Sequence, residues 1–430
     1  MKVLIIGSGG REHAIAWKIK QSPRLKKLYC APGNGGTAAI AENVSIKADD
    51  LSGLAGFCEK EKIDLTIVGP EAPLAFGIVD LFKEKNLKIF GPLKAAARLE
   101  GSKVFMKGVC RDEGIPTANF EIFDNAAAAK NFIKSKNTPV VVKADGLAAG
   151  KGVVVAKTTA EAINAVDSIM GDRVFGSAGD KIIVEECLEG EEASIIVLSD
   201  GENIIPLASS QDHKRIFDGD KGSNTGGMGA YSPAPVVTGE IFEETISKII
   251  MPAIRGMKKK GIPVKGVLYA GIMIFGAMPK LLEFNVRLGD PETQAILPRL
   301  NSDLLELLDM AAGGSLKGCD LDWSEKACVS VVMASGGYPG KYEKGKEIFG
   351  LEKTLGLGDT MVFHAGTAYG EGRRVITSGG RVLNVSALGN TIKEAIGKAY
   401  RACGLIRFEG MQYRKDIGYK AINIIGAKNG

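Results

Sequence analysis

The stretch Lys280-Leu281-Leu282-Glu283-Phe284-Asn285-Val286-Arg287-Leu288-Gly289-Asp290-Pro291-Glu292 decides how the rest of the chain is interpreted. Apolar and polar residues alternate from position 282 to position 287, and this period of two predicts a β-strand. Its polar face would carry Glu283, Asn285 and Arg287. A solvated edge strand with a surface ion pair has the same pattern. The strand alone therefore leaves a structural and a functional interpretation open.

The functional interpretation is a magnesium site beside a cationic group. The carboxylate of Glu283 and the amide oxygen of Asn285 are hard ligands, which Mg²⁺ prefers and commonly supplements with substrate phosphates. Arg287 could bind a carboxylate or phosphate through two parallel hydrogen bonds. Under this interpretation Glu283 and Asn285 would bind Mg²⁺, and Arg287 would bind an anionic group of the substrate.

Composition excludes several classes of protein. The chain has 430 residues, enough for about three domains. Its net charge of +5 comes from 55 basic and 50 acidic residues without a dense basic block, which argues against nucleic-acid binding. The first apolar segment ends at Gly7, too early for a signal peptide, and no apolar run approaches a membrane span. We therefore expect a cytoplasmic protein that binds small molecules.

Cysteine and histidine usage narrows the chemistry further. The seven cysteines are scattered without a Cys-x-x-Cys pair, so neither a disulfide framework nor a zinc site is predicted. The only histidines are His13, His213 and His364. Catalysis by histidine is therefore possible but not favoured.

The first hundred residues have the pattern of a parallel α/β sheet. Short apolar strands at 2–6, 27–31, 64–68 and 87–90 alternate with helical segments that include 52–61 and 72–85. The loops after the first three strands, within 7–10, 31–36 and 69–73, should emerge at one edge of the sheet.

These loops suit a small phosphorylated ligand. Gly9 and Gly10 precede a helix, where free N–H groups and the helix dipole favour an anion. The third glycine of a dinucleotide fingerprint is replaced by Glu12. We therefore expect a small phosphorylated ligand at Gly9 and Gly10 in preference to a purely structural set of turns, with Asn34 and Glu71 placed to meet sugar hydroxyls.

A glycine-rich hairpin follows in the middle of the chain. The loop 145–152 joins apolar strands at 139–143 and 153–156, so it lacks the strand-to-helix context of a Walker loop. Its glycines could close over phosphates, and Lys143 and Lys151 would supply positive charge. The alternative, a surface hairpin without function, is less favoured because Lys143 ends a strongly apolar strand.

The remaining segments are less specific when taken alone. The acidic run 185–192 could be a solvated turn. The long loop 211–233 is expected to be functional or disordered. From residue 325 onwards, strands at 327–334, 361–365 and 381–387 precede a helix that Thr391 should cap. No cluster of reactive residues stands out there, so we expect this region to pack against and close the molecule.

Together these stretches resemble the ATP-grasp ligases, and among them the phosphoribosylamine–glycine ligases (glycinamide ribonucleotide synthetases). The most specific match is Arg287-Leu288-Gly289-Asp290-Pro291-Glu292-Thr293-Gln294. The stretches 3–13, 31–36, 142–152, 211–233 and 335–340 also match. One residue is unusual, since Cys187 stands where an aromatic residue is common.

The resemblance implies an α/β fold (α+β multidomain) with three parts. Residues 1–101 would form a Rossmann-like substrate domain with a parallel sheet. Residues 102–324 would form a two-lobed ATP-grasp domain, with a lid subdomain at about 118–190. Residues 325–430 would form a small, mainly β C-terminal domain.

The resemblance also implies roles for individual residues. Lys103 and Lys143 would hold the ATP phosphates under the loop 145–152, Glu185 and the backbone of Cys187 and Leu188 would meet adenine, and Glu192 would bind the ribose. The full ATP set is Lys103, Lys143, Gly146, Gly150, Lys151, Gly152, Glu185, Cys187, Leu188 and Glu192. The substrate set is Gly9, Gly10, Asn34, Glu71, Asp212, Arg287 and Asp290, and the catalytic residues are Arg287 and Lys143.

The implied reaction joins glycine to 5-phosphoribosylamine through a glycyl phosphate, releasing ADP and phosphate, in purine synthesis. Such phosphoryl transfer needs positioning and charge neutralisation, which lysines, Mg²⁺ and Arg287 can supply. We expect small-molecule substrates, no nucleic-acid or membrane partner, and a monomer. Two alternatives are a biotin-carboxylase-like ligase and a non-enzymatic nucleotide-binding module. The latter would not need Glu283, Asn285 and Arg287 on one strand.

Overall fold

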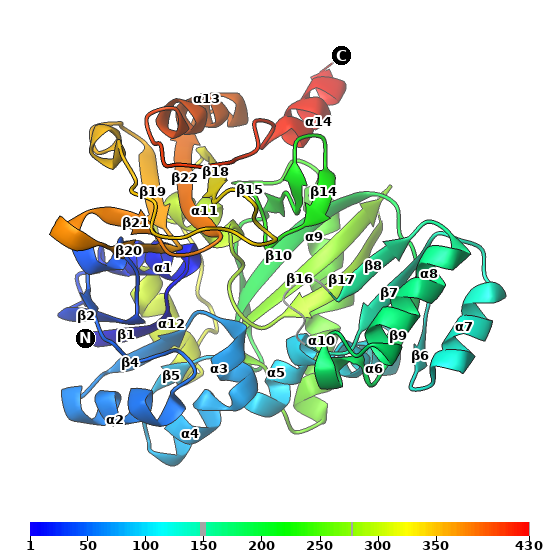
Figure 1. Ribbon diagram of the computed structural model, residues 1–430. Coiled ribbons are helices and arrows are strands. Elements are labelled where there is room, and N and C mark those ends of the chain that lie inside the picture. Colours follow the sequence, from blue (N-terminus) through cyan, green and yellow to red (C-terminus); the bar gives the residue numbers. More distant parts are fainter. Residues whose placement is uncertain (147–151, 277, 430) are drawn as a thin grey trace.

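The computed structural model describes residues 1–146, 152–276 and 278–429. Gly150 and Lys151, which we expected in the lid, lie outside the described residues. Four larger sheets, with five, four, five and four strands among the described residues, organise the molecule (Figure 1). No helix in these parts of the chain is long and apolar enough to cross a membrane.

The N-terminal sheet is parallel, as expected, with strand order β3-β2-β1-β4-β5. Its strands are β1 (Lys2–Gly7), β2 (Lys27–Pro32), β3 (Glu42–Asn43), β4 (Leu65–Val68) and β5 (Ile89–Phe90). Its helices are α1 (Gly10–Ile19), α2 (Leu51–Glu61), α3 (Glu71–Phe76) and α4 (Ile78–Glu84). The helix expected at 72–85 is thus two helices, because Gly77 adopts a left-handed φ of 94° that ends the first of them.

Two helices connect this sheet to the rest of the molecule. They are α5 (Lys94–Gly101), which the sequence pattern did not predict, and α6 (Lys103–Glu113). Ser102 lies between them and caps α6, since its hydroxyl accepts the Phe105 N–H at 3.0 Å. The joint therefore fixes where α6 begins.

A separate antiparallel sheet with strand order β6-β9-β7-β8 forms the predicted lid region (Figure 1). Its elements are β6 (Phe120–Phe123), α7 (Ala126–Lys134), β7 (Val140–Ala144), β8 (Val153–Ala156), α8 (Thr159–Val166) and β9 (Ile182–Glu186). Ile133 of α7 and Val166 of α8 are buried with Val142 of β7 in a core of their own. Both helices therefore cover this sheet.

The central antiparallel sheet has strand order β11-β10-β16-β17. Its strands are β10 (Glu191–Asp200), β11 (Ile204–Pro206), β16 (Lys265–Phe275) and β17 (Met278–Asn285). Nearby helices are α9 (Gly239–Thr245), α10 (Met251–Lys259), α11 (Glu292–Ile296) and α12 (Leu304–Gly313). Successive residues of β10 are buried in different cores. Val197 is buried in the same core as Met257 of α10, and Leu198 in the same core as Leu304 of α12. Helices therefore cover both faces of the sheet.

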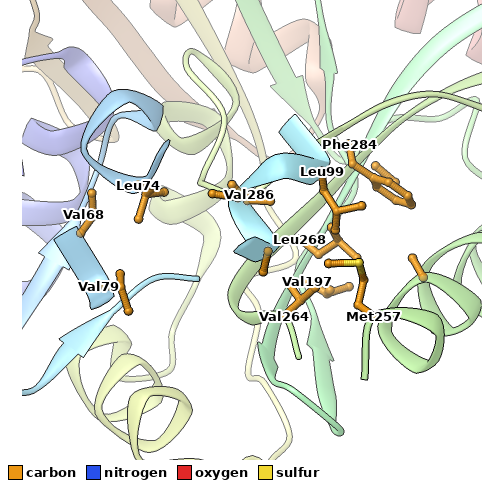
Figure 2. Close-up of a cluster of buried hydrophobic side chains, with 14 of the residues drawn as sticks. Val68, Leu74, Val79, Leu99, Val197, Met257, Val264, Leu268, Phe284 and Val286 are labelled. Carbon is orange, nitrogen blue, oxygen red and sulfur yellow. The ribbon is translucent and has the colours of Figure 1, made fainter. Parts of the chain in front are cut away.

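One apolar core joins the N-terminal and central sheets. Figure 2 shows Val68, Leu74 and Val79 on the N-terminal side, and Leu268 and Met257 among the residues of the central domain. All are buried in a single cluster. Because burial of apolar area stabilises at about 25 cal/mol per Å², a continuous core of this kind fixes the two sheets relative to each other.

A β-bulge interrupts β17, the strand that carries Glu283 and Asn285. The pairing of β17 with β16 shifts at Gly271, so Glu283 lies opposite Gly271 while Leu281 lies opposite Ile272. Leu282 has no opposite residue in this register, and Leu281 is fully buried instead. The alternation expected from residue 282 onwards is therefore interrupted at its first residue, because a bulge adds one residue to the strand.

The last large sheet is antiparallel with strand order β12-β15-β18-β22-β19. Its strands are β12 (Gln211–Asp212), β15 (Gly229–Ser232), β18 (Ala327–Ala334), β19 (Thr360–His364) and β22 (Arg381–Gly389). Other elements of this region are β13 (Arg215–Phe217), β14 (Lys221–Asn224), α13 (Ile392–Cys403) and α14 (Tyr419–Asn429). The segment 211–233, expected to be a loop, thus contains four short strands, and two of them extend the C-terminal sheet.

Candidate active site

The polar face of β17 brings the predicted metal ligands together. Glu283 lies opposite Gly271, whose missing side chain leaves room for the glutamate. The Asn285 amide donates to Glu283 Oε1 at 3.4 Å, and Arg287 Nη2 donates to Asn285 Oδ1 at 3.3 Å. Arg287 lies in the loop after β17, which ends at Asn285. The three side chains nevertheless converge as the sequence predicts.

The charges of three lysines act on the carboxylate of Glu283. Burial alone would raise the pKa of Glu283, but the charges of Lys214, Lys143 and Lys103 outweigh burial and lower this pKa below its usual value. Glu283 is therefore an anion at neutral pH, as a magnesium ligand must be. Within the described residues no group of three or more His, Cys, Asp or Glu side chains could hold a metal. A metal at Glu283 and Asn285 would need further ligands from a substrate.

A second carboxylate holds two lysines together. Glu185 on β9 pairs with Lys143 at 2.8 Å and with Lys107 at 3.1 Å. The side chains of Lys107 and Glu185 are 0% and 3% exposed, so each charge needs its partner. Lys107 was missed in the sequence, although it lies one turn after Lys103 on the same face of α6.

The pairing of Glu185 bears on its predicted contact with adenine. Both of its carboxylate oxygens face lysines in this structure. Its role in nucleotide binding stays a prediction, as do those of Cys187 and Leu188, which follow β9 directly. What the structure adds is that Glu185 orients two lysines.

The base of the predicted lid is tied to the start of α6. Asp145 accepts hydrogen bonds from the Ser102 hydroxyl and the Val104 N–H, both at 3.0 Å. Lys103 Nζ donates to the carbonyl oxygen of Gly146 at 3.1 Å. On the opposite side of the hairpin, the Gly152 carbonyl accepts the Ala144 N–H at 2.8 Å. The lid residues that are described therefore lie beside the predicted phosphate-binding lysines.

A cavity of about 350 Å³ on α6 is a different feature. It is lined in part by Phe105, Gly108, Val109 and Asp112. These positions lie on the side of α6 opposite to Lys103 and Lys107 at 3.6 residues per turn. This cavity is therefore not the space that the two lysines face.

Asp212 and Lys214 add further charges near Glu283 and connect it to Glu192, the residue predicted to bind ribose. Lys214 pairs with Glu192 at 2.7 Å. Burial raises the pKa of Asp212 to about 7, and the nearby charges of Glu292, Glu192 and Glu283 add to this, whereas Lys214 opposes it. Lys214 lies in a stretch that the sequence marked as functional, but its role there was not foreseen.

A buried hydrogen-bonded network lies next to this charged cluster. The Tyr269 hydroxyl donates to Glu292 Oε1 at 2.8 Å and lies 2.8 Å from the Ser194 hydroxyl. Ser194 lies opposite Gly271, as Glu283 does. No signal in the sequence marks Ser194 or Tyr269, because their proximity depends on the pairing of β10 with β16.

At the N-terminal sheet, Glu12 occupies the place of the absent third glycine. The Gly9 N–H donates to Glu12 Oε2 at 2.5 Å. A side chain at Gly7 or Gly69 would collide with Glu12, so this glutamate fills the space above both strand ends. A Cβ at Gly9 would lie 3.3 Å from Asp290 Oδ2. The structure thus brings together Gly9 and Asp290, two predicted substrate residues far apart in the sequence.

Asn34 is already engaged by the protein. Its amide donates to the carbonyl oxygens of Ser8 at 2.9 Å and His364 at 2.8 Å. Its side-chain oxygen accepts the N–H groups of Gly36 at 2.8 Å and Thr37 at 2.9 Å. These bonds join three segments of chain, so the expected contact with sugar hydroxyls would have to compete with them.

Arg287 is held between two carboxylates of the N-terminal part. Its guanidinium lies 3.0 Å from Glu100 on α5 and 3.5 Å from Glu71 on α3. Burial disfavours its charge, but the carboxylates of Glu100 and Glu71 outweigh burial and raise the pKa of Arg287. Glu71 was predicted as a substrate residue, whereas Glu100 was not foreseen.

The C-terminal region does more than the packing that we expected from its sequence. Arg381 on β22 donates to the Asp290 carbonyl at 2.7 Å and lies 3.4 Å from the Asp290 carboxylate. The side chains of Asn384 and Gln294 crowd Gly10. This region therefore lines the predicted substrate loops.

The three histidines are buried in the protein. Burial lowers the pKa of His13 and of His213 to about 3 and that of His364 to about 4. His13 Nδ1 accepts the backbone N–H of His364 at 2.8 Å. Neutral, buried imidazoles agree with chemistry that relies on lysine, carboxylate and arginine.

Comparison with known proteins gives matches along nearly the whole chain. Family models for phosphoribosylglycinamide synthetase match residues 1–100 (N domain), 101–293 (ATP-grasp domain) and 328–420 (C domain). The phosphoribosylamine–glycine ligase of Ralstonia nicotianae is 53% identical, covering 98% of this chain and 100% of the relative. That of Yersinia pestis is 52% identical, covering 98% and 99%.

Solved structures agree with this assignment of the fold. The crystal structure of phosphoribosylamine–glycine ligase from Thermotoga maritima has a TM-score of 0.85 at 34% identity, covering 97% of this chain and 100% of that chain. A biotin carboxylase from Campylobacter jejuni has a TM-score of 0.75 at 16% identity, covering 96% and 93%. At 16% identity this similarity shows only that the two proteins share a fold.

Proposed function

Because this chain belongs to the phosphoribosylglycinamide synthetase family, we propose that the residues around Glu283 carry out that family's ligation chemistry in this protein. The chain is an ATP-dependent ligase that joins glycine to phosphoribosylamine in purine biosynthesis. The observation that best supports the assignment is the hydrogen-bonded series Glu283–Asn285–Arg287, with the positive charges of three lysines near enough to lower the pKa of Glu283.

ATP is assigned to the space between the lid sheet and β17. Lys103 and Lys143 would hold its phosphates, because both lie near Glu283 and the base of the lid. Glu192 would bind the ribose hydroxyls, and Glu185 with the backbone of Cys187 and Leu188 would meet adenine. The loop 145–152 would cover the phosphates, which rests on its sequence alone.

Glu283 and Asn285 would hold Mg²⁺ or Mn²⁺. The donor set fits, since an ionised carboxylate and an amide oxygen lie on one face of β17. When bound, the metal would neutralise phosphate charge during phosphoryl transfer.

Arg287 would orient the glycine carboxylate for attack on the γ-phosphoryl group of ATP. The carboxylate oxygen bonds to phosphorus as ADP leaves, which gives glycyl phosphate. The substrate amine then bonds to the carbonyl carbon as phosphate leaves and the amine gives up a proton. Asp212 is our candidate for accepting this proton, since its pKa of about 7 suits exchange near neutrality. The lysines would neutralise the charge that develops on the phosphates.

Phosphoribosylamine is assigned to the edge of the N-terminal sheet. Gly9 and Gly10 would bind its phosphate, which would have to replace the Glu12 carboxylate as acceptor of the Gly9 N–H. Glu71 and Asp290 would contact the sugar or amine. Asn34 would mainly position these loops, because its hydrogen bonds lie within the protein. We further propose that the enzyme is a cytoplasmic monomer.

The test is phosphate release with ATP, Mg²⁺, glycine and phosphoribosylamine, omitting each in turn. Full activity should require all four. Bicarbonate in place of glycine should give no amine-dependent turnover. Turnover with bicarbonate, or ATP hydrolysis that does not depend on glycine, would contradict the substrate assignment.

A further inference from the structure

Glu100 is a buried carboxylate that no predicted role explains. It is the next-to-last residue of α5, and its side chain is 8% exposed. Burial raises the pKa of Glu100, and the charge of Arg287 opposes this rise. A carboxylate in such a place is costly unless both oxygens have partners.

The two oxygens of Glu100 have different partners. Oε1 lies 3.0 Å from Arg287 Nη2, and Oε2 accepts the Val286 N–H at 2.9 Å. One carboxylate thus holds both the guanidinium and the backbone of the residue before it. This pair of contacts fixes the direction in which Arg287 leaves the end of β17.

The residues that precede Glu100 and Arg287 in the chain are both packed into the apolar core. Leu99, the preceding residue of α5, and Val286 are 1% and 2% exposed and belong to the same apolar core. Figure 2 shows Leu99 and Val286 among the side chains of this cluster. Because close-packed side chains have little freedom to move, α5 and the end of β17 form a rigid support.

We propose that Glu100 is a positioning residue for the ligation reaction, which fixes the Arg287 guanidinium without contacting a substrate itself. The proposal rests on the assignment of Arg287 to glycine binding given above. The direct passage from α5 to α6 fits this role. Lys103 follows Glu100 by three residues, so one short segment sets the places of both Arg287 and the lysine proposed to bind phosphate.

Glu100→Gln tests the proposal, because glutamine has one acceptor oxygen for the two donors that glutamate serves. We expect kcat to fall about 10- to 100-fold, as misplaced catalytic groups commonly cost. The KM for ATP should stay within about twofold, since the ATP residues are untouched. Glu113→Gln is the matched control: Glu113 also contacts a basic residue between helices, Lys259 at 3.1 Å, and its loss should leave kcat unchanged.

A double-mutant cycle with Arg287→Lys separates positioning from general stability. If Glu100 acts through the guanidinium, adding Glu100→Gln to Arg287→Lys should lower kcat by less than about threefold. Equal losses of kcat in both backgrounds, or a wild-type kcat in Glu100→Gln, would overturn the proposal. Should Glu100→Gln fail to fold, Glu100→Asp decides: reduced kcat at wild-type Tm supports positioning, and wild-type kcat refutes it. The proposed function is tested in the wild type, whose turnover should require glycine and phosphoribosylamine. If it does, a wild-type kcat in Glu100→Gln contradicts the positioning role alone.

Discussion

Two carboxylates in the same charged pocket are driven in opposite directions by their neighbours. The charges of three nearby lysines lower the pKa of Glu283 despite its burial. Burial raises the pKa of Asp212 to about 7, because the charge of Lys214 opposes this rise only in part and three glutamates add to it. The residue type predicts neither state, because each depends on the charges that folding brings close. One carboxylate is therefore suited to holding a cation, and the other to exchanging a proton.

Glu283→Gln should leave the fold intact and greatly weaken metal-dependent turnover. The substitution keeps the volume of the side chain but removes the anionic ligand, so activity at limiting Mg²⁺ should fall at least about tenfold. Higher Mg²⁺ should restore part of it. Phosphate release titrated against Mg²⁺, with circular dichroism as the control for folding, gives the answer. Unchanged activity at limiting metal would remove Glu283 from the metal site.

Asp212→Asn should stabilise the protein increasingly as the pH rises. The folded protein binds the Asp212 proton more tightly than the unfolded chain, whose pKa is near 3.8. Ionising Asp212 therefore lowers the free energy of unfolding of the wild type. This loss is absent below about pH 4, grows between pH 4 and pH 7, and is complete above pH 7. We expect a gain on the order of 1–2 kcal/mol at pH 8, below the limit of about 1.4 kcal/mol for each pKa unit.

Urea unfolding of the wild type and of Asp212→Asn at pH 4, 6 and 8 measures this gain. The difference in stability should be smallest at pH 4. A difference that does not change with pH would show that the pKa of Asp212 is not raised. Catalytic activity is a separate matter, and we expect it to fall in the variant because asparagine cannot accept the proton.

At the scale of elements, the joint between α5 and α6 links helix stability to nucleotide binding. The Ser102 hydroxyl accepts the Phe105 N–H and also donates to Asp145 at the base of the lid. The adjacent Lys103 contacts the carbonyl of Gly146. This cap therefore places Lys103, the lysine proposed to bind phosphate, and satisfies one of the free N–H groups at the start of α6.

Ser102→Ala should lower stability by about 1 kcal/mol through loss of the cap and raise the KM for ATP several-fold. Thr158→Ala is the matched control, because Thr158 caps α8 by accepting the Glu161 N–H at 3.2 Å. It should cost similar stability without changing the KM for ATP. Thermal unfolding and initial rates give both quantities. Equal effects of the two variants on KM would argue against a special role for the joint.

Elements with a clear period were predictable, and those shaped by pairing were not. The apolar strands of the N-terminal sheet and the hairpin strands β7 and β8 agree with their predicted ranges within one or two residues. The helix α5 was missed, and β12 has only two residues, too few for a pattern. The bulge at Leu282 depends on the partner strand, so no local rule could reveal it.

At the scale of the whole molecule, the site is built from segments that the chain order keeps apart. Asn34 bonds to the carbonyl of His364, and Arg287 pairs with Glu100. Sequence motifs predicted which stretches matter, including the face that carries Glu283. They could not predict supporting residues such as Glu100 and Arg381, because these are defined only by contacts across domains.

The separation of ATP from phosphoribosylamine gives a prediction for the whole molecule. Gly9 lies in the loop between β1 and α1, and a Cβ there would lie 2.8 Å from Glu12 Oε2 and 3.3 Å from Asp290 Oδ2. Gly9→Val should therefore displace both carboxylates and raise the KM for phosphoribosylamine about tenfold or more, since small misplacements are costly. The KM for ATP should remain nearly unchanged, because its assigned residues lie on other elements.

Gly56→Val in α2 is the matched control for this substitution, because a Cβ at Gly56 meets no atom within 4 Å. It should change neither KM, although valine in a helix can cost some stability. Thermal unfolding of both variants shows whether the fold survives, and initial rates with each substrate varied give the two KM values. Weakened ATP binding with phosphoribosylamine spared would reverse the division of labour proposed between the two regions. Tight binding of NAD by the wild type would also contradict it, because Glu12 fills the space above Gly7 and Gly69 that close approach of a pyrophosphate requires.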